Sequence, residues 1–481
     1  MNKRMIFSSV GMVLMFESAL LVLPIITSLI YGEKCVFAFL ITAVGAFLAG
    51  LLIKVLSRPK THVIYAKEGF VIVAFTWIVL SLVGALPFVL SGEIPSYADA
   101  FFETVSGFTT TGASVVTNVE ELSHGVLFWR SFTHFIGGMG ILVFVMAIMP
   151  KVSDRPMHIL RAEMPGPVIG KVVPKARETA KILYLIYIAV TLLEAILLSF
   201  GDMSIFESLL HALGTAGTGG FGLKADSIVS YSAYTQWVIT IFMYVFSVNF
   251  NLYYLLLIRN FRSALSSREL WFFFGVVAAS VGVITINIYS IYGNTADSVR
   301  HSAFQVATVL STTGYSSADF NTWPLLSKTL LVCLMFMGGC AGSTAGGIKA
   351  SRILMMFKII GKEIRRAIHP RSVDTVRMDG KSVDNATVRS VTNYFLIYFV
   401  CFIAIFLLLG FEPFDFETNF TATTACFNNI GPGLGMVGPM GSYSGYSVFS
   451  KVLLSFAMLF GRLEIFPMIV IFVPSTWKKN K

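Results

Sequence analysis

Four glycine-rich clusters recur along the chain, three of them also containing threonine, and their residue types suit the binding of a dehydrated cation. They lie at residues 109–113, 217–220, 311–315 and 429–433. Glycine adopts backbone angles that turn successive carbonyl groups to one side, and carbonyl oxygens can replace the water around an ion. The four clusters therefore predict a cation filter made of backbone loops. The predicted ligands are Thr110, Thr111, Gly112, Gly217, Thr218, Gly219, Thr312, Thr313, Gly314, Asn429, Ile430 and Gly431.

Close packing of membrane helices is the competing explanation for such clusters, because small residues let helices approach one another. For any one cluster alone, that explanation is the more common one. Here each cluster follows an apolar run too short to span a membrane, and Gly112, Gly219, Gly314 and Gly431 align at the same place in a repeating unit. This repetition favours the filter.

The short apolar runs are expected to be helices that end at the filter. Their C-terminal ends carry partial negative charge, which favours a nearby cation. Acids near their starts suit the opposite, positive end, although solvated surface charges explain these acids equally well. The acids are Asp99, Glu207, Asp297 and Glu417.

The elements that position these loops are predicted to be membrane spans. The chain has 481 residues, of which 55% are apolar and only 13% charged, and this composition excludes an ordinary soluble enzyme. The first apolar run follows Lys3 and Arg4, but it is too long for a signal peptide and has no small-residue cleavage site before Tyr31. Ten runs are long enough to cross a bilayer. They lie at 6–30, 35–57, 69–91, 126–150, 179–200, 232–258, 270–292, 327–357, 389–411 and 446–474.

The charges of the connections alternate between basic and acidic. Basic residues follow the even-numbered spans: Lys54, Arg58, Lys60, Lys67, Lys151, Arg155, Arg161, Lys171, Lys175, Arg177, Arg259, Arg262, Arg268, Lys362, Arg365, Arg366, Arg371, Arg377, Lys478, Lys479 and Lys481. The intervening connections carry mostly acids. The positive-inside rule then predicts that both termini are cytoplasmic, and it explains the net charge of +10 without a nucleic-acid partner.

Together these patterns predict an all-α polytopic membrane protein. Two N-terminal helices precede four pseudo-symmetric repeats of helix, pore loop and helix around one pore, because non-helical backbone at membrane depth survives only where it lines a cavity. The expected units are an N-terminal domain and four repeats. They cover residues 1–67, 68–178, 179–268, 269–388 and 389–481.

Several longer motifs carry a family resemblance. The loops read TTTGA, TAGTGGF, STTGY and NNIGPGLG, and further motifs are WRSFTHFIGGMGI from Trp129, RAEMPGP from Arg161, GGCAGSTAGGIK from Gly338 and GRLEIFP from Gly461. With these motifs the chain resembles the Trk/Ktr/HKT superfamily of K⁺ transporters, and within it the TrkH/TrkG type of potassium uptake subunit. The pair of N-terminal helices favours the Trk branch over the shorter Ktr type.

The resemblance implies K⁺ as the transported ion and one filter formed by four repeats of a single chain. It also implies a multi-pass protein of the bacterial inner membrane that assembles as a homodimer. A cytoplasmic regulatory subunit of TrkA type would carry the nucleotide, and the transporter itself would carry none. The basic connections around Lys362–Arg389 and Lys151–Arg177 suit docking of that subunit, although topology alone explains them equally well.

The eighth span is interrupted by glycines, so we do not expect a continuous helix there. A phosphate-binding loop is excluded, because no Lys-Ser/Thr pair follows the last glycine and no strand precedes it. In the family the matching segment is an intramembrane gate below the filter. The resemblance assigns that role to Gly338, Gly339, Gly342, Ser343, Thr344, Gly346 and Gly347.

Arg462 lies deep in the last span, where a charge is costly and indicates a functional position. We expect it to face the pore and repel resting cations, and the resemblance agrees. The alternatives are a pair with Glu464, which is two residues away and so does not face Arg462 on a helix, or packing satisfied by backbone carbonyls.

Other functions are less well supported. The seven histidines form no HExxH motif and no GxSxG sequence occurs, so no enzyme is expected. An inverted-repeat secondary transporter would have broken helices in two copies rather than four parallel loops. A Na⁺- or H⁺-coupled K⁺ symporter of the same fold remains open, because no visible ion site distinguishes it from a gated channel.

Overall fold

A computed structural model describes residues 2–58, 66–140, 176–371 and 374–477. The described part is helical nearly throughout. Its strands are a single antiparallel pair, β1 (Arg377–Met378) and β2 (Lys381–Ser382). Apolar residues in long runs leave no polar face for a sheet to expose, so helices that satisfy their own backbone groups are the expected result.

The N-terminal unit is a helical hairpin. Helix α1 (Lys3–Leu20) continues after a break at Leu21 into α2 (Val22–Ile30), and α3 (Val36–Leu56) returns alongside α1. The two helices meet at Gly11 and Gly50: a Cβ added at Gly11 would lie 2.7 Å from the carbonyl oxygen of Gly50. Glycines at this crossing therefore let the two backbones touch.

The same order of elements then occurs four times: a long helix, a short helix, a loop and a second helix. The long helices are α4 (Ala66–Gly84) with α5 (Leu86–Leu90), α10 (Ala176–Ser199), α15 (Arg268–Tyr292) and α19 (Asn385–Leu409). The short helices are α6 (Tyr97–Phe108), α11 (Ile205–Gly217), α16 (Thr295–Leu310) and α20 (Phe416–Phe427). The second helices are α7 (His124–Gly138), α12 (Ala233–Ser247), α17 (Leu325–Met335) and α21 (Val448–Arg462).

Five further helices and three short 3₁₀ turns complete the described chain. The helices are α13 (Phe250–Leu257), α14 (Phe261–Leu265), α18 (Ala350–Ile368), α22 (Phe466–Phe472) and α23 (Pro474–Trp477). The turns lie in the connections after three of the loops, at Val119–Glu121, Phe320–Thr322 and Gly435–Val437.

Polar caps fix where the short helices begin. Ser96 accepts a hydrogen bond from the backbone of Asp99, Ser204 and Glu207 form a capping box, and Asp415 accepts from Thr418. Each of the four helices carries an acid in its first turn, as the sequence predicts: Asp99, Glu207, Asp297 and Glu417. The opposite ends of these helices therefore point their partial negative charge at the four loops.

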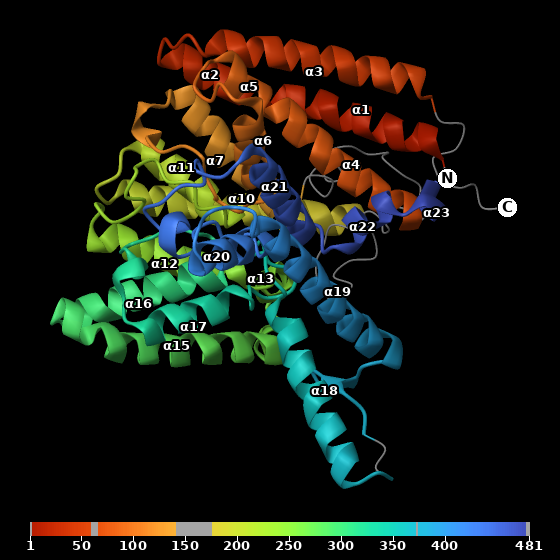
Figure 1. Cartoon of the computed structure of the whole chain (residues 1–481), viewed down its shortest axis with the longest axis vertical. Helices are drawn as coiled ribbons and strands as arrows, with labels where there is room; N and C mark the ends of the chain where they lie inside the picture. The colour runs from red at the N-terminus through yellow and green to blue at the C-terminus, as the bar shows by residue number, and fades with distance from the viewer. Residues whose placement is uncertain (1, 59–65, 141–175, 372–373, 478–481) are drawn as a thin grey trace.

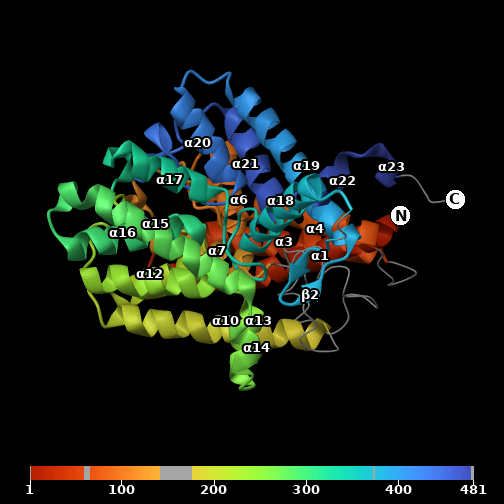
Figure 2. The ribbon, with the colours of Figure 1, turned by 90° about the horizontal axis from the view of Figure 1, so that it is seen from below.

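The first helices of the chain lie along one edge of the molecule, and α15, α16 and α17 lie along the opposite edge (Figure 1). The last unit, α19 to α21, packs between them, so segments from both ends of the sequence adjoin. Helix α18 leaves the body and projects away from it. The view from below in Figure 2 shows α10 and α12 side by side beneath this assembly.

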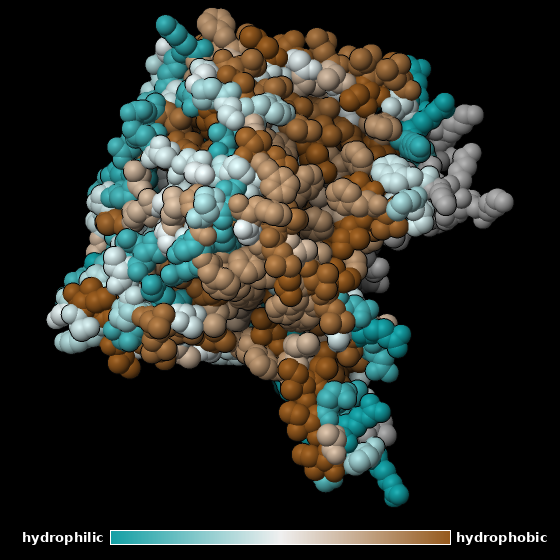
Figure 3. All heavy atoms as spheres, viewed as in Figure 1, coloured by the Kyte–Doolittle hydropathy of each residue, from teal (hydrophilic) through white to brown (hydrophobic). Residues whose placement is uncertain are grey.

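Six described helices are long and apolar enough to cross a membrane, and a seventh span results if the bent pair α12 and α13 is counted. Exposed apolar side chains cover α3, α10, α15 and α19, and Figure 3 shows apolar surface at the top and bottom edges with polar residues along the left side. Such extensive exposed apolar surface indicates contact with lipid.

The expectation of continuous helices is corrected for the sixth and tenth predicted spans, whereas the break in the eighth agrees with the sequence. The predicted sixth span bends by 90° between α12 and α13, where Val248 and Asn249 leave the helix. The eighth is broken between α17 and α18, and the tenth ends at Arg462, followed by left-handed backbone at Glu464 and Ile465. The fourth contains α7, and its residues 141–150 lie outside the described part.

Candidate functional site

All four short helices end in the same backbone motif. One or two residues after each helix, the chain adopts a left-handed conformation, with φ between 55° and 57°, and the next residue donates its N–H to a carbonyl five positions earlier. These are Schellman ends, which normally use glycine at the left-handed position. Here the position holds Thr110, Thr218, Thr312 and Asn429. A β-branched residue in this conformation is strained, and such strain concentrates at functional sites.

A left-handed glycine follows two residues after each of these positions. The four are Gly112, Gly220, Gly314 and Gly431, with φ values of 80°, 73°, 91° and 95°. The backbone therefore aligns Gly220, and not Gly219, with the other three, which corrects the sequence alignment of the second loop by one residue. In the second loop, Gly219 is the equivalent of Thr111, Thr313 and Ile430. Gly217, which the sequence placed among the loop ligands, is the last residue of helix α11.

At Gly219 a side chain is excluded by a neighbouring ring and not by a left-handed backbone conformation. The ring of His134 from α7 occupies the place where its Cβ would lie. His134 is fully buried, its Nδ1 lies 2.8 Å from the carbonyl oxygen of Gly107, and its Nε2 accepts from the backbone of Phe221. The histidine thus connects α6 to the second loop, and only glycine leaves room for its ring.

The four loops form a closed ring. A Cβ added at Gly112 would overlap the carbonyl oxygen of Gly219, one at Gly220 that of Thr313, and one at Gly314 that of Ile430. The ring closes because a Cβ at Gly431 would lie 2.6 Å from the carbonyl oxygen of Thr111. Each loop therefore touches the next through a glycine and a carbonyl at equivalent positions, and a side chain at any of the four glycines would meet backbone.

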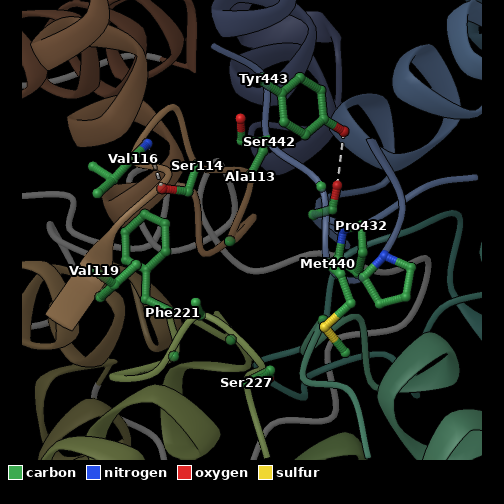
Figure 4. A pocket seen from close by; sticks show the side chains of 18 of the residues that line it. Ala113, Ser114, Val116, Val119, Phe221, Ser227, Pro432, Met440, Ser442 and Tyr443 are labelled. Atoms are coloured by element: carbon green, nitrogen blue, oxygen red, sulfur yellow. Dashed lines mark hydrogen bonds between the residues drawn. The ribbon is translucent and has the colours of Figure 1, made fainter. Parts of the chain in front are cut away.

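A cavity of about 180 Å³ opens on this ring, and all four left-handed glycines line it. Figure 4 shows Ala113 and Ser114 on one side of the cavity and Pro432 and Met440 on the other. The hydroxyl of Tyr443 donates to the carbonyl oxygen of Gly431 at 2.7 Å, which holds the fourth loop at the wall of the cavity (Figure 4). The arrangement offers backbone oxygens and four helix C-termini to a small ion, a setting that favours a cation.

A buried ion pair supports the first loop, and sequence reasoning did not find it. Glu103 of α6 lies 2.7 Å from Arg130 of α7, and both are almost fully buried. The Glu103 carboxylate also accepts hydrogen bonds from the hydroxyl of Ser114 and the backbone N–H of Val115. The pair therefore joins two helices to the chain that leaves the ring. A glutamate inside a short apolar run was the available signal.

Replacing Glu103 by Gln should lower discrimination between K⁺ and Na⁺ more than it lowers uptake. The change keeps the size of the side chain but leaves Arg130 as an uncompensated buried charge, a situation that costs about 3–5 kcal/mol when a buried pair is broken. We expect the first loop to lose its fixed position. The measurement is the K⁺/Na⁺ uptake ratio in proteoliposomes, with Glu93→Gln as the matched control, because the Glu93 carboxylate accepts its hydrogen bonds from Ser123 in a connection away from the ring. An unchanged ratio in folded protein would contradict this role.

The glycine-rich segment between α17 and α18 is not helical, as the sequence predicts. Gly338, Gly342 and Gly347 adopt left-handed conformations. The backbone N–H of Gly346 donates to the Thr312 hydroxyl at 2.6 Å, and a Cβ at Gly346 would lie 2.6 Å from the carbonyl oxygen of Asn428. The segment therefore packs against the third and fourth loops. Gly339, Ser343 and Thr344 lie within it.

Arg462 binds three backbone carbonyls. Its guanidinium donates to the carbonyl oxygens of Thr344 at 2.7 Å and of Gly137 and Gly138 at 2.6 Å. The carbonyl-satisfied arrangement is thus the one observed, but the carbonyls belong to the glycine-rich segment and to the end of α7. Arg462 connects these two segments directly.

Two more buried cations surround the segment. Lys349 ends it and donates to the carbonyl oxygen of Ala345, and Arg352 pairs with Glu464. The Arg352 guanidinium also lies 4.1 Å from the centre of the Tyr394 ring. Glu269 accepts hydrogen bonds from the backbone N–H groups of Ala341 and Ser351, so two acids, Glu269 and Glu464, stand beside the three cations and leave an excess of one positive formal charge below the loops.

Some predicted features lie outside the described residues. They are the RAEMPGP motif at 161–167, the basic residues between 151 and 175, and the terminal residues 478–481.

Comparison with known proteins gives consistent matches over the whole chain. The family model of TrkH, a cation transport protein, matches residues 36–479. The Trk system potassium uptake protein TrkH of Escherichia coli K12 is 35% identical, with full coverage of both chains, and TrkG of the same organism is 32% identical over 99% of each. The crystal structure of the potassium transporter TrkH from Vibrio parahaemolyticus superimposes with a TM-score of 0.89 at 31% identity, covering 99% of this chain and 100% of that one.

Proposed function

Because the chain belongs to the TrkH family of cation transport proteins, we propose that it takes up K⁺ across the bacterial inner membrane through the ring of four loops. It is a membrane transporter and not an enzyme. The observation that carries the proposal is the closed ring, in which Gly112, Gly220, Gly314 and Gly431 each pack against a carbonyl of the next loop. A ring of equivalent carbonyls is the chemistry that replaces the hydration shell of K⁺.

We assign one ion-binding level of the filter to four carbonyl oxygens, those of Thr111, Gly219, Thr313 and Ile430. They occupy equivalent positions, and their loops are held at fixed distances by glycine contacts. The hydroxyl groups of Thr110, Thr218 and Thr312 and the side chain of Asn429 lie one residue earlier, at the helix ends. The cavity above the glycines receives the ion from outside.

The glycine-rich segment and Arg462 form the gate in this proposal. The segment lies against two of the loops, and Arg462 ties it to α7 through Thr344. A closed state would then combine a steric block with the positive charge of the arginine. Opening requires the segment to move away, which breaks the contact between Arg462 and Thr344.

The remaining assignments complete the proposal. The units at 1–67, 68–178, 179–268, 269–388 and 389–481 are an N-terminal domain and four pseudo-symmetric repeats around one pore. The termini are cytoplasmic, the protein assembles as a homodimer, and a TrkA-type subunit carrying the nucleotide docks on the cytoplasmic face. Relatives bear the name of the Trk system, which supports a multi-component assembly.

We expect the purified chain in proteoliposomes to take up ⁸⁶Rb⁺, and we expect a TrkA-type subunit from the same organism to change this uptake in a nucleotide-dependent way. Protein-free liposomes are the control. Imposed Na⁺, H⁺ and voltage gradients distinguish a gated channel from coupled symport of the same fold. Absence of ⁸⁶Rb⁺ uptake under every gradient, with and without the partner, would refute the proposed function, and uptake that ignores the partner would refute only its regulation.

A further inference from the structure

A second cavity, of about 410 Å³, lies between the start of α15 and the projecting part of α18, away from the ring of loops. It is lined by Arg268, Lys358, Lys362, Arg365, Asp374, Thr375, Val376 and Arg377. Five of these side chains are cations and one is an acid. This excess is unusual for a cavity, because like charges that share a site repel one another.

The partners within the cavity do not balance this charge. Lys358 donates to the carbonyl oxygen of Arg377 at 2.7 Å, which holds the lysine in place without neutralising it. Arg365 lies 3.9 Å from Asp374, a long and half-exposed ion pair. Asp379 accepts a hydrogen bond from the backbone N–H of Arg268 at 2.9 Å. Burial and the charge of Arg268 lower the pKa of Lys358, as expected where cations crowd together.

We propose that this cavity binds a phosphate-bearing anion, either the headgroup of an anionic phospholipid or a free phosphate compound. Arginine offers paired N–H donors that match phosphate oxygens, and lysine adds a mobile point charge. The cavity supplies both kinds of donor from two helices and from the strand β1. Binding of a phosphate anion would relieve the repulsion among the five cations.

The position of the cavity puts a lipid headgroup within reach. Arg268 begins α15, one of the helices long and apolar enough to span a membrane. Trp271 of α15 and Phe357 of α18 are 62% and 60% exposed, and Phe357 lies beside Phe272 with ring centres 6.3 Å apart. The cations therefore adjoin an apolar surface that faces lipid. Figure 3 shows the same contrast on α18, with apolar residues along one flank and polar residues on the other.

The test compares the double variant Lys358→Gln/Lys362→Gln with Arg366→Gln/Lys381→Gln in the purified full-length protein. The control removes the same charge from exposed positions that do not line the cavity. Each cation near a membrane surface contributes about 1 kcal/mol to binding anionic lipid, so the cavity variant should bind about 30-fold more weakly. Native mass spectrometry with added phosphatidylglycerol measures the lipid, and titration with inorganic pyrophosphate measures a free phosphate.

A lipid headgroup and a free phosphate compound give different results in this test. Preference for phosphatidylglycerol over phosphatidylcholine that disappears only in the cavity variant supports a lipid headgroup. Pyrophosphate binding with the same dependence, and no lipid preference, supports a free phosphate compound. If neither probe binds, or if both double variants bind like wild type, the proposal fails. The single reversal Lys362→Glu is the second variant should the double one not fold. Binding of lipid or pyrophosphate is measured directly and without transport, which keeps this test independent of the proposed function.

Discussion

Serine in place of Gly112, Gly220, Gly314 or Gly431 should reduce the preference for K⁺ over Na⁺ at least about fivefold. Each glycine has left-handed backbone, and its missing Cβ leaves space for a carbonyl of the next loop. A side chain must displace that carbonyl or force the backbone into another conformation. Strain of about 1–3 kcal/mol at such a site corresponds to a change of roughly five- to 150-fold in an equilibrium. The measurement is the reversal potential, or the ⁸⁶Rb⁺ uptake in the presence of Na⁺.

Gly282→Ser is the matched control. Gly282 lies in α15, where an added Cβ meets no atom within 4 Å. We expect this variant to keep wild-type selectivity. If all four ring variants fold and retain the selectivity of Gly282→Ser, the ring does not select the ion.

Alanine substitutions at the neighbouring glycines test the corrected register of the second loop. Ala at Gly219 overlaps the His134 side chain, so the additional change His134→Ala should restore part of the lost selectivity. Ala at Gly220 overlaps the Thr313 carbonyl and is strained by its φ of 73°, so His134→Ala should not rescue it. Equal rescue of both would contradict the corrected register.

Loss of the gate contacts should produce the second large effect, an increase in flux without the cytoplasmic partner. Arg462→Ala removes a charge whose repulsion of a K⁺ ion about 7 Å away is on the order of 2 kcal/mol at an effective dielectric near 20. It also removes the hydrogen bonds to Thr344, Gly137 and Gly138. We expect at least tenfold faster ⁸⁶Rb⁺ uptake. Deletion of residues 338–347 should raise uptake further, because it removes the steric block itself.

The contact between Arg462 and Thr344 also predicts how the two changes combine. Residues in direct contact show coupling, so the double variant should gain less than the product of the two single effects. Arg462→Lys keeps the charge but cannot bridge three carbonyls in the same way, and we expect an intermediate flux. Unchanged or reduced flux in folded forms of both single variants would show that the segment is packing and not a gate.

The sequence was sufficient to locate the loops but not to set their register. Glycine follows each short apolar run, with threonine before it in three of the four loops, so the four helix ends could be placed within a residue or two. In the second loop two glycines are adjacent, and sequence alone does not distinguish the one required by a positive φ, Gly220, from the one required by the His134 ring. That distinction depends on a helix far away in the chain.

Other features could not be predicted because they depend on tertiary contacts. Hydropathy treats the segment 232–258 as one apolar run, yet the chain turns at Val248 and Asn249, and the Asn249 side chain caps the next helix. The partner of Glu103 lies on a different helix, at Arg130. The three carbonyls around Arg462 come from two separate segments, so position in a span could indicate importance but not the contacts.

The most direct test of the central claim is the location of the ion itself. Crystals of the protein grown in Rb⁺ should give an anomalous peak within the ring, bounded by the carbonyl oxygens of Thr111, Gly219, Thr313 and Ile430. The same crystals of Gly220→Ser should lose that peak or show it weakened. Anomalous peaks confined to positions away from the four loops, with a well-ordered and empty ring, would contradict the account.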